Sequence, residues 1–401
     1  MQKKARPLDG IRVLELGHLL AGPFTGSILA YYGAEVIKVE APGNGDPLRS
    51  WRELDDDGTS FWWRSLGRNK KCVTANLRKA AGRELVARLA GKCNVLVENF
   101  SPGVMEKWGL GPAQLWEDNP ALIYARISGY GQDGPWSAKP GFASVCEGVG
   151  GLRYVNGQPN EAPMRPNLSL GDTMAGIHTA LGVVMACLFQ TNNPGSKGQV
   201  IDTALYESVF NLLEGVIPEY DGAGVVREPS GTTVTGIVPT NTYRCSDGRF
   251  IIIGASGDSI FIRLCEKMGR PDMAGDARFA DNTGRVRFEK EIDSAIAQWT
   301  ATLDSGRVLS LMDEARVPSG PIYSVADMMV NEHFIARGLF EEVSVNGKPL
   351  KIPAMVPRLS ETPGRTDWPG PEVGAFNKAI YTDMLGLSAE ELSELESSGV
   401  L

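Results

Sequence analysis

Histidine is scarce in this sequence and its cysteines are not paired, and both features narrow the chemistry open to it. The 401 residues include three histidines and six cysteines, and no two cysteines have CxxC spacing. Zinc sites need clusters of these side chains, so the sequence predicts no metal site. Cysteines scattered along a long chain also fit a reducing compartment better than a disulfide framework.

An excess of basic residues and a long apolar run are lacking as well. The formal net charge is −8, whereas surfaces that bind nucleic acid are basic, so no nucleic-acid partner is expected. A membrane span needs about 18 apolar residues, and the longest candidate, 176–190, is interrupted by His178 and Thr179, which favours a buried helix. The basic residues 1–7 precede no apolar signal core. We therefore expect a cytoplasmic protein without a membrane partner.

Two common signatures of enzyme sites are also absent. The segment 17–23, which follows the first predicted strand, is not GxGxxG, so the standard dinucleotide fingerprint is missing. No GxSxG elbow is present, which disfavours a serine hydrolase. His18 and His178 belong to no recognisable triad, and neither is favoured as a general base.

What the first 200 residues do contain is an alternation of β-branched runs and helical patterns. Alternating units of this kind predict an α/β fold with a parallel sheet, helices on both faces and ligands at the carboxyl ends of the strands. Strands are predicted at 11–16, 34–40, 94–97, 122–127 and 199–204, and helices at 23–32, 82–90, 172–190 and 206–217.

The alternation of strand and helix patterns does not continue after about residue 220, which suggests a second domain. A hairpin is predicted over 242–255, because its Asp247-Gly248 pair suits a tight turn. We therefore predict a large domain from 1–220, a small α+β domain from 221–330, and a return to the large domain over 331–401.

Two local features allow more than one interpretation. Asp172 follows a glycine at the start of a predicted helix, where a carboxylate commonly caps the free N–H groups. The same place keeps a carboxylate ionised, and a positioned carboxylate can attack a thioester. The basic residues of 68–71 and 78–79 form either a solvated face or a site for ligand phosphates.

Ordered blocks along nearly the whole chain carry a family resemblance. They lie at 8–15, 21–23, 33–40, 45–46, 68–71, 97–103, 128–132, 171–172, 195–199 and 317–322. In these blocks the chain resembles the class III CoA-transferase family, which includes formyl-CoA transferases, carnitine CoA-transferases and bile-acid-inducible proteins. The resemblance implies a Rossmann-like large domain built from both chain ends, a small middle domain, and a homodimer whose chains interlock like linked rings.

The resemblance also implies a chemistry and a set of site residues. It implies that Asp172 attacks an acyl-CoA, giving a mixed anhydride and then an aspartyl-CoA thioester, and that an acceptor acid reverses these steps. It implies that no cofactor is bound permanently and that coenzyme A enters as substrate. The coenzyme A contacts that the resemblance implies are Leu20, Ala21, Ala75, Arg78, Asn99, Phe100, Ser101 and Lys107.

Departures from the family pattern bear on the substrate. Leu20 replaces a glutamine of the formyl-transferring members, and Phe142-Ala143 replaces their Tyr-Glu pair, which disfavours formyl-CoA and oxalate. The glycine-rich lid is matched only by the segment from Gly254 to Gly257. We expect transfer of coenzyme A to a small or dicarboxylic acid. The alternatives are an α-methylacyl-CoA racemase, whose histidine is replaced by Phe142, and a non-catalytic acyl-CoA-binding protein.

Overall fold

The computed structural model describes residues 4–401, which form two compact units. The large unit contains the chain up to Leu152, Pro166–Glu214 and Ile335–Leu401, and the small unit contains Arg153–Arg165 and Gly215–Phe334. Both chain ends therefore build the large unit. The small domain was predicted to end the first part of the large domain at residue 220 and to extend to 330, whereas these boundaries lie at 214 and 334. The prediction did not assign Arg153–Arg165 to the small unit.

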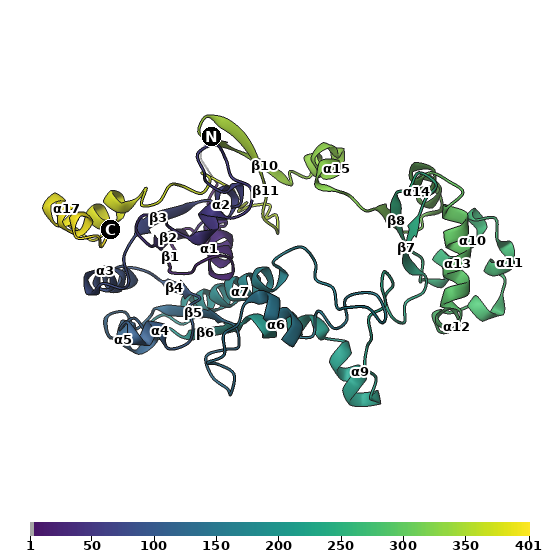
Figure 1. Cartoon of the computed structure of the whole chain (residues 1–401), viewed down its shortest axis with the longest axis horizontal. Coiled ribbons are helices and arrows are strands. Elements are labelled where there is room, and N and C mark those ends of the chain that lie inside the picture. The colour runs from purple at the N-terminus through teal and green to yellow at the C-terminus, as the bar shows by residue number, and fades with distance from the viewer. Residues whose placement is uncertain (1–3) are drawn as a thin grey trace. The chain divides into compact units, whose positions relative to one another are not determined.

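A six-stranded sheet forms the centre of the large unit (Figure 1). All its neighbouring strands are parallel, and their order is β3-β2-β1-β4-β5-β6, the order of the Rossmann fold. The strands are β1 (Arg12–Glu15), β2 (Glu35–Glu40), β3 (Lys70–Thr74), β4 (Val95–Glu98), β5 (Ile123–Ser128) and β6 (Val200–Ala204). The predicted α/β class and parallel sheet are confirmed.

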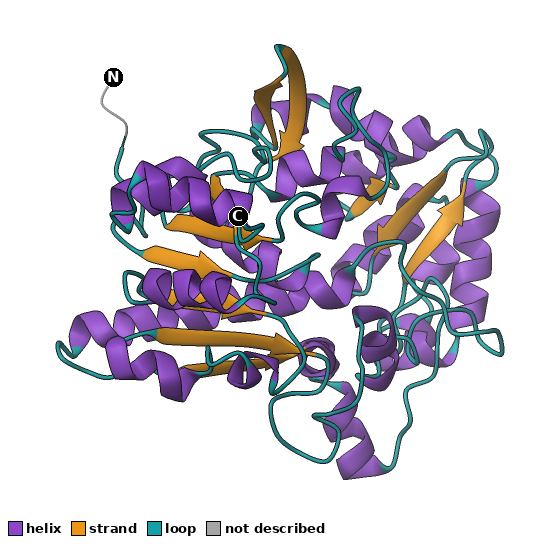
Figure 2. Cartoon of the chain, turned by 60° about the vertical axis from the view of Figure 1, so that its left-hand side comes forward, coloured by secondary structure: helices purple, strands orange, loops and turns teal. Residues whose placement is uncertain are grey.

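Alternate residues of the strands feed two separate cores, as the pleat of a sheet requires. Val13 packs with Val36 and Val95 on the face covered by α1 (Ala21–Tyr31) and α7 (Leu170–Asn192). Leu14, Ile37 and Leu96 point to the opposite face, which is covered by α3 (Ala80–Ala90) and by C-terminal side chains such as Ile380 and Tyr381. Figure 2 shows helices on both sides of the strands.

Shorter elements connect the strands of the large unit and complete it. They are η1 (Pro47–Ser50), α2 (Phe61–Leu66), α4 (Val104–Lys107), α5 (Pro112–Asp118), α6 (Ala143–Val149), α8 (Leu205–Phe210), η2 (Asn211–Leu213), β10 (Phe340–Val345), β11 (Lys348–Pro353), η4 (Ala379–Met384) and α17 (Ala389–Ser397). The sequence patterns had not indicated β3 or the β10–β11 hairpin. The helix predicted over 206–217 is confirmed only in part, because α8 ends at Phe210, a 3-10 turn follows at Asn211–Leu213, and a separate helix starts at Val216.

The small unit has an antiparallel sheet of order β7-β8-β9 packed against helices. The predicted hairpin is confirmed as β7 and β8, with Gly248 at a φ of 80° in its turn. Its elements are α9 (Val216–Ala223), β7 (Thr240–Arg244), β8 (Phe250–Gly254), α10 (Asp258–Lys267), α11 (Pro271–Ala274), η3 (Ala277–Phe279), α12 (Asn282–Arg287), α13 (Glu289–Thr300), α14 (Ser305–Ala315), β9 (Ser319–Pro321) and α15 (Val325–Val330), with α16 (Glu332–Ala336) at the boundary.

Helix α7 is apolar on two faces, and only one of them is buried. Its buried side chains, such as Ala175, Thr179 and Val183, pack against α1, β5 and β6. The opposite face exposes six apolar side chains at helical spacing: Ile177, Leu181, Val184, Met185, Leu188 and Phe189. The prediction of a buried helix is therefore wrong for this face. By length and composition alone α7 could cross a membrane, but its inner face packs as a helix that covers a sheet.

Candidate functional site

Asp172 lies in the first turn of α7, but it is not the N-cap. The helix begins at Leu170, and the N-cap position belongs to Ser169, whose side chain makes no capping hydrogen bond. Asp172 is thus the third helical residue and is partly buried. The N-cap interpretation was wrong, yet this position still lies at the positive end of the helix dipole, which favours an ionised carboxylate.

The first turn of α1 packs against the second turn of α7. A Cβ at Gly176, one turn beyond Asp172, would meet the Ala21 carbonyl oxygen at 3.1 Å. The Thr25 hydroxyl donates to that carbonyl at 3.0 Å and to the Gly176 carbonyl at 3.2 Å. Of the predicted contacts, Ala21 is therefore brought to the same edge of the unit as Asp172.

Phe142 also borders this turn. It is the N-cap of α6, and the next residue, Ala143, would lie 3.3 Å from a Cβ at Gly171. The Phe142 side chain is 72% exposed. An exposed aromatic residue thus directly precedes the residue of α6 that packs against the first turn of α7.

A tightly tethered loop joins β1 to α1. The His18 N–H donates to Asn99 Oδ1 at 2.8 Å, and Asn99 Nδ2 donates to the His18 carbonyl at 2.9 Å. The Leu19 N–H donates to both Asp46 oxygens, at 3.1 and 3.2 Å, and Leu19 adopts a φ of 63°. The loop lies where the strand order reverses between β1 and β4, the position where ligands bind such sheets.

A group of buried charged side chains holds this loop in place. Lys38 Nζ lies 3.0 Å from Glu15 Oε1, 2.9 Å from Asp46 Oδ2 and 2.7 Å from the Gly17 carbonyl oxygen. Lys70 Nζ lies 2.9 Å from Glu15 Oε2, and all four charged side chains are fully buried. Burial alone would raise the pKa of Asp46, but Lys38 and the Leu48 N–H outweigh it and hold the pKa below its usual value. Burial, and then Lys38, lowers the pKa of His18, which favours the neutral form of its ring.

Arg68 and Lys70 of the basic cluster have a structural role, so neither interpretation of the cluster applies to these two residues. Arg68 is 1% exposed, and its guanidinium donates to the Pro353 carbonyl at 2.6 Å. Lys70 points into the core, and Lys71 pairs with Glu35 at 2.6 Å. The buried Arg68 and Lys70 therefore neither form a solvated face nor offer charges to a ligand, whereas Lys71 is partly exposed. The pairing could not be found from local patterns, since Glu15 lies far from Lys70 in the sequence.

A cavity of about 500 Å³ opens at the carboxyl ends of β1 to β4. The rings of His18 and Phe100 lie 5.3 Å apart, and those of Phe100 and Trp108 lie 5.1 Å apart. Aromatic walls beside a guanidinium suit a nucleotide, whose base packs on the rings and whose phosphates pair with the cation. The lining residues are His18, Val39, Glu40, Ala41, Pro42, Ala75, Asn76, Leu77, Arg78, Phe100 and Trp108.

Three predicted contacts, Ala75, Arg78 and Phe100, therefore line one cavity. Sequence reasoning missed Trp108, which could have been noticed as the aromatic neighbour of Lys107. The other predicted residues lie around the cavity. Leu20 packs with Leu48 and Trp63 in the core, so its side chain is buried, while Ser101 and Lys107 are exposed and Asn99 tethers the first loop.

The predicted lid residues belong to the small unit. Gly254 ends β8, and Gly257 is the N-cap of α10. The intervening segment is held by the fully buried Arg285, which donates to the Ser256 carbonyl and to Asp258 Oδ1. That these glycines cover Asp172 stays a prediction.

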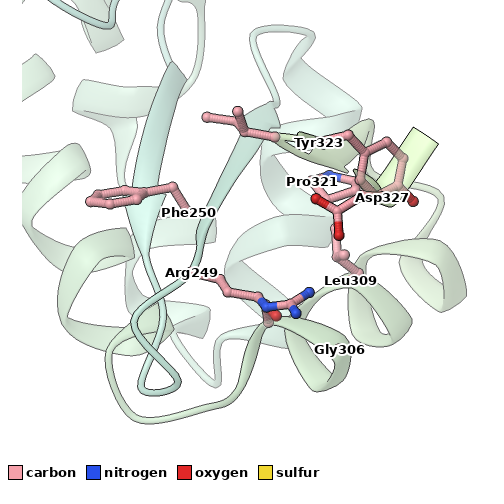
Figure 3. Close-up of a pocket in the computed structure, with 9 residues that line it drawn as sticks. Arg249, Phe250, Gly306, Leu309, Pro321, Tyr323 and Asp327 are labelled. Carbon is pink, nitrogen blue, oxygen red and sulfur yellow. The ribbon is translucent and has the colours of Figure 1, made fainter. Parts of the chain in front are cut away.

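A second cavity of about 460 Å³ lies within the small unit (Figure 3). Figure 3 shows Arg249 beside Gly306, with Tyr323 and Asp327 on the other wall. None of the predicted site residues lines it. Among residues 4–401 there is also no cluster of three or more histidine, cysteine, aspartate or glutamate side chains that could hold a metal ion.

Comparison with known proteins identifies the family. A sequence model described as "CoA-transferase family III" matches residues 8–377. The chain is 45% identical over 403 residues to succinyl-CoA–D-citramalate CoA-transferase of Chloroflexus aurantiacus, covering 100% of this chain and 99% of that protein. It is 32% identical over 398 residues to human succinyl-CoA:glutarate CoA-transferase, covering 99% and 90%.

A solved structure agrees with these matches. The crystal structure of a CAIB/BAIF family protein from Brucella suis has a TM-score of 0.83 at 32% identity, covering 95% of this chain and 100% of that one. Similarity of sequence and of fold thus extends over both units. The chain belongs to the family III CoA-transferases.

Proposed function

We propose that this enzyme transfers coenzyme A from succinyl-CoA, or a similar dicarboxylic acyl-CoA, to a second small organic acid, with Asp172 as the covalent nucleophile. The single observation that carries the mechanism is the place of Asp172 in the first turn of α7, a helix whose second turn packs against the first turn of α1. Two helix N-termini there favour negative charge on the nucleophile and on the oxyanion that forms when it attacks. The dicarboxylic substrate class is supported by the names of relatives that act on citramalate, malate and glutarate.

The first half of the proposed reaction loads coenzyme A onto the enzyme. An oxygen of Asp172 attacks the thioester carbonyl carbon, the C–S bond breaks, and the thiolate of coenzyme A leaves with the electron pair. The thiolate then attacks the Asp172 carbonyl carbon of the mixed anhydride. The C–O bond to the donor acyl group breaks, and the donor acid leaves as a carboxylate.

The second half transfers coenzyme A to the acceptor. The acceptor carboxylate attacks the carbonyl carbon of the aspartyl-CoA thioester and releases the thiolate again. The thiolate attacks the acceptor's own carbonyl carbon in the new anhydride, which frees the Asp172 carboxylate and the product thioester. No proton or redox equivalent is needed, so the only nucleophile the protein must supply is the carboxylate.

The cavity beside the first loop is the proposed site of the nucleotide portion of coenzyme A. Phe100 and Trp108 supply ring faces for the base, and Arg78 supplies the cation for phosphate. His18 links this cavity to the loop that leads into α1 and to Ala21. The thioester end of a ligand anchored here is thereby directed toward the start of α1.

Trapping of the covalent thioester tests the proposal directly. After incubation with succinyl-CoA, the intact protein is expected to gain the mass of coenzyme A, and cleavage by hydroxylamine is expected to map the adduct to Asp172. A panel of other acyl-CoAs identifies the donor. A protein that turns over succinyl-CoA and acceptor without any adduct at Asp172 would refute the mechanism.

Glu98 gives the proposed coenzyme A site a dependence on pH. Its buried carboxylate accepts from Arg126 Nε at 2.7 Å and from the Phe100 N–H at 2.7 Å. Burial raises the pKa of Glu98 to about 7, although Arg126 opposes the shift. Below that pH the carboxyl gains a proton and loses its charge, which weakens both its hydrogen bond from Arg126 and the hydrogen bond that anchors the backbone of Phe100.

We expect the KM for acyl-CoA to rise about 3- to 10-fold as the pH falls from about 8 to about 6. Glu98→Gln does not titrate and is expected to give a nearly flat profile over this range. Glu106→Gln is the matched control, since Glu106 also binds Arg126 but has a lowered pKa, first because of the hydrogen bond from Arg126. Identical pH profiles for the wild type and Glu98→Gln would contradict this role.

The exposed apolar face of α7 supports a homodimer, which we also propose. Its six apolar side chains form one continuous stripe at helical spacing, and exposed stripes of this kind mark association surfaces. The predicted interlocking of the two chains stays part of this proposal. It is consistent with a chain that enters the large unit, leaves it for the small unit and then returns.

Light scattering is expected to give twice the chain mass at micromolar concentration. Leu181→Lys combined with Leu188→Lys is expected to lower that mass or to prevent folding, because two charges would enter the apolar stripe. Ala113→Lys with Gln114→Lys adds the same charge to the exposed surface of α5 and is expected to leave the mass unchanged. A monomeric wild type would rule the dimer out.

A further inference from the structure

The buried Glu147 is not accounted for by the proposed reaction. It lies on α6, and its side chain is fully buried. Its Oε1 accepts a hydrogen bond from the Gly171 N–H at 3.2 Å. Gly171 is the second residue of α7 and directly precedes Asp172. A carboxylate on a neighbouring helix thus binds one of the free amides in the same helical turn as the nucleophile.

The packing around this hydrogen bond is close. A Cβ at Gly171 would lie 3.2 Å from Glu147 Cγ and 3.3 Å from the Ala143 Cβ, which leaves little space for any side chain there. Helix α6 is itself fixed, since the Cys146 thiol donates to the Gly129 carbonyl at 3.3 Å. At Gly150, after α6, a Cβ would lie 2.3 Å from Val209 Cγ2. Glu147 therefore approaches α7 from a helix that has little freedom to move.

The two carboxylates also lie close enough to act on one thiol. Burial raises the pKa of Cys146 to about 11, and the charges of Asp172 and Glu147, in that order, add to the effect. Asp172 and Glu147 therefore lie within electrostatic range of the same sulfur. A buried carboxylate near another acidic group is unfavourable unless hydrogen bonds compensate it, and the Gly171 amide provides one such bond.

We propose that Glu147 is a positioning residue for Asp172, holding the first turn of α7 in one geometry throughout the reaction. The inference rests on the proposed function. Asp172 is a carboxylate at the start but becomes a neutral anhydride and then a neutral thioester. The electrostatic interaction between Asp172 and its helix N-terminus therefore changes at each step, whereas Glu147 accepts the Gly171 N–H in every state. The carboxyl group of Asp172 stays in place while its charge comes and goes.

The rate at which the aspartyl-CoA adduct forms distinguishes a positioning role of Glu147 from a role in folding alone. Glu147→Ala is expected to slow the appearance of the aspartyl-CoA adduct about 100-fold, since small misplacements of reacting atoms cost this much. The KM for acyl-CoA should change little, because Glu147 does not line the nucleotide cavity. Glu147→Gln keeps an oxygen that can accept from Gly171 and should recover most of the rate.

Thr179→Ala is the matched control. It removes a buried hydrogen bond of α7, from the Thr179 hydroxyl to the Ala175 carbonyl at 2.7 Å, about two turns from Asp172. Its adduct rate is expected to match the wild type. If Glu147→Ala does not fold, Glu147→Asp replaces it, because the shorter side chain withdraws the oxygen from Gly171, and it should be slower than Glu147→Gln.

Each outcome bears on a distinct claim. A wild type that forms no adduct overturns the proposed function itself. A wild type that forms the adduct, together with an equally fast Glu147→Ala or a Glu147→Asp at least as fast as Glu147→Gln, overturns only the positioning role. Equal slowing by Thr179→Ala would likewise overturn it, because loss of any buried contact of α7 would then suffice.

Discussion

Asp172→Ala is expected to lower kcat/KM for coenzyme A transfer by at least about 10⁴-fold, because removal of a covalent nucleophile leaves only binding contributions. The adduct with coenzyme A should disappear at the same time. Acyl-CoA should still bind, since the cavity lined by Phe100, Trp108 and Arg78 does not include Asp172. A full loss of kcat with nearly unchanged binding is the pattern that identifies a nucleophile.

Two controls distinguish the loss of the nucleophile from the loss of a negative charge in the first turn of a helix. Asp172→Asn keeps the shape of the side chain while removing its charge, and it should be as inactive as Asp172→Ala. Glu390→Gln removes a first-turn carboxylate from α17, an exposed helix of the same unit, and should leave kcat unchanged. Transfer by Asp172→Ala at the wild-type rate would contradict the mechanism.

The same variant tests the alternatives to a transferase mechanism. In a protein that only binds acyl-CoA, the wild type would form no adduct, and Asp172→Ala would change nothing. In a racemase, solvent deuterium would enter the acyl α-carbon without any exchange of carboxylates. Phe142, which borders the first turn of α7, has no proton to transfer, so the racemase reaction lacks one of its groups here.

The sheet could be predicted because its strands are local patterns. Strands β1, β2, β4, β5 and β6 are short β-branched runs separated by helical segments, and they were found within one or two residues of their ends. The strand β3 was missed because its first residues, Lys70 and Lys71, look like a solvated basic cluster. Lys70 can be buried because it pairs with Glu15 on β1. The two residues are far apart in the sequence, so the pattern of neighbouring residues does not reveal this pairing.

The candidate site was predictable only as far as the family resemblance extends. The resemblance supplied Asp172 and three residues of the cavity, Ala75, Arg78 and Phe100. It did not supply Glu147, whose relation to Asp172 arises from the packing of α6 against α7. The exposed face of α7 was missed because apolar residues occupy both sides of the helix, so periodicity alone does not reveal that one side lacks a partner.

Lys38→Met is expected to destabilise the large unit by about 3–5 kcal/mol, because removing one partner of a buried ion pair leaves an uncompensated charge. Glu15 and Asp46, both fully buried, would lose their shared cation. Burial lowers the pKa of Lys38, but Asp46 and Glu15 outweigh it and hold the pKa above its usual value. The stabilisation is therefore fully present at neutral pH, below the unfolded pKa of about 10.4.

Removal of Lys38 should also weaken the binding of acyl-CoA, because Lys38 holds the loop between β1 and α1. Lys38 donates to the Gly17 carbonyl. Asp46 accepts from the Leu19 N–H and so holds Leu19 in its left-handed conformation. Without Lys38, both anchors of the loop that leads to α1 weaken, so the KM for acyl-CoA should rise together with the fall in stability. The test compares denaturant unfolding and KM in the same preparation of the variant.

A double variant decides whether charge imbalance is the cause. Lys38→Met with Asp46→Asn removes one charge of each sign and leaves Glu15 paired with Lys70, so it should recover part of the stability lost by Lys38→Met. Lys348→Met, which breaks a pair with Asp56 between two exposed side chains, should have no measurable effect. If the double variant is less stable than Lys38→Met, the loss arises from the missing side chain rather than from an unpaired charge, and the four buried charges do not act as one neutral group.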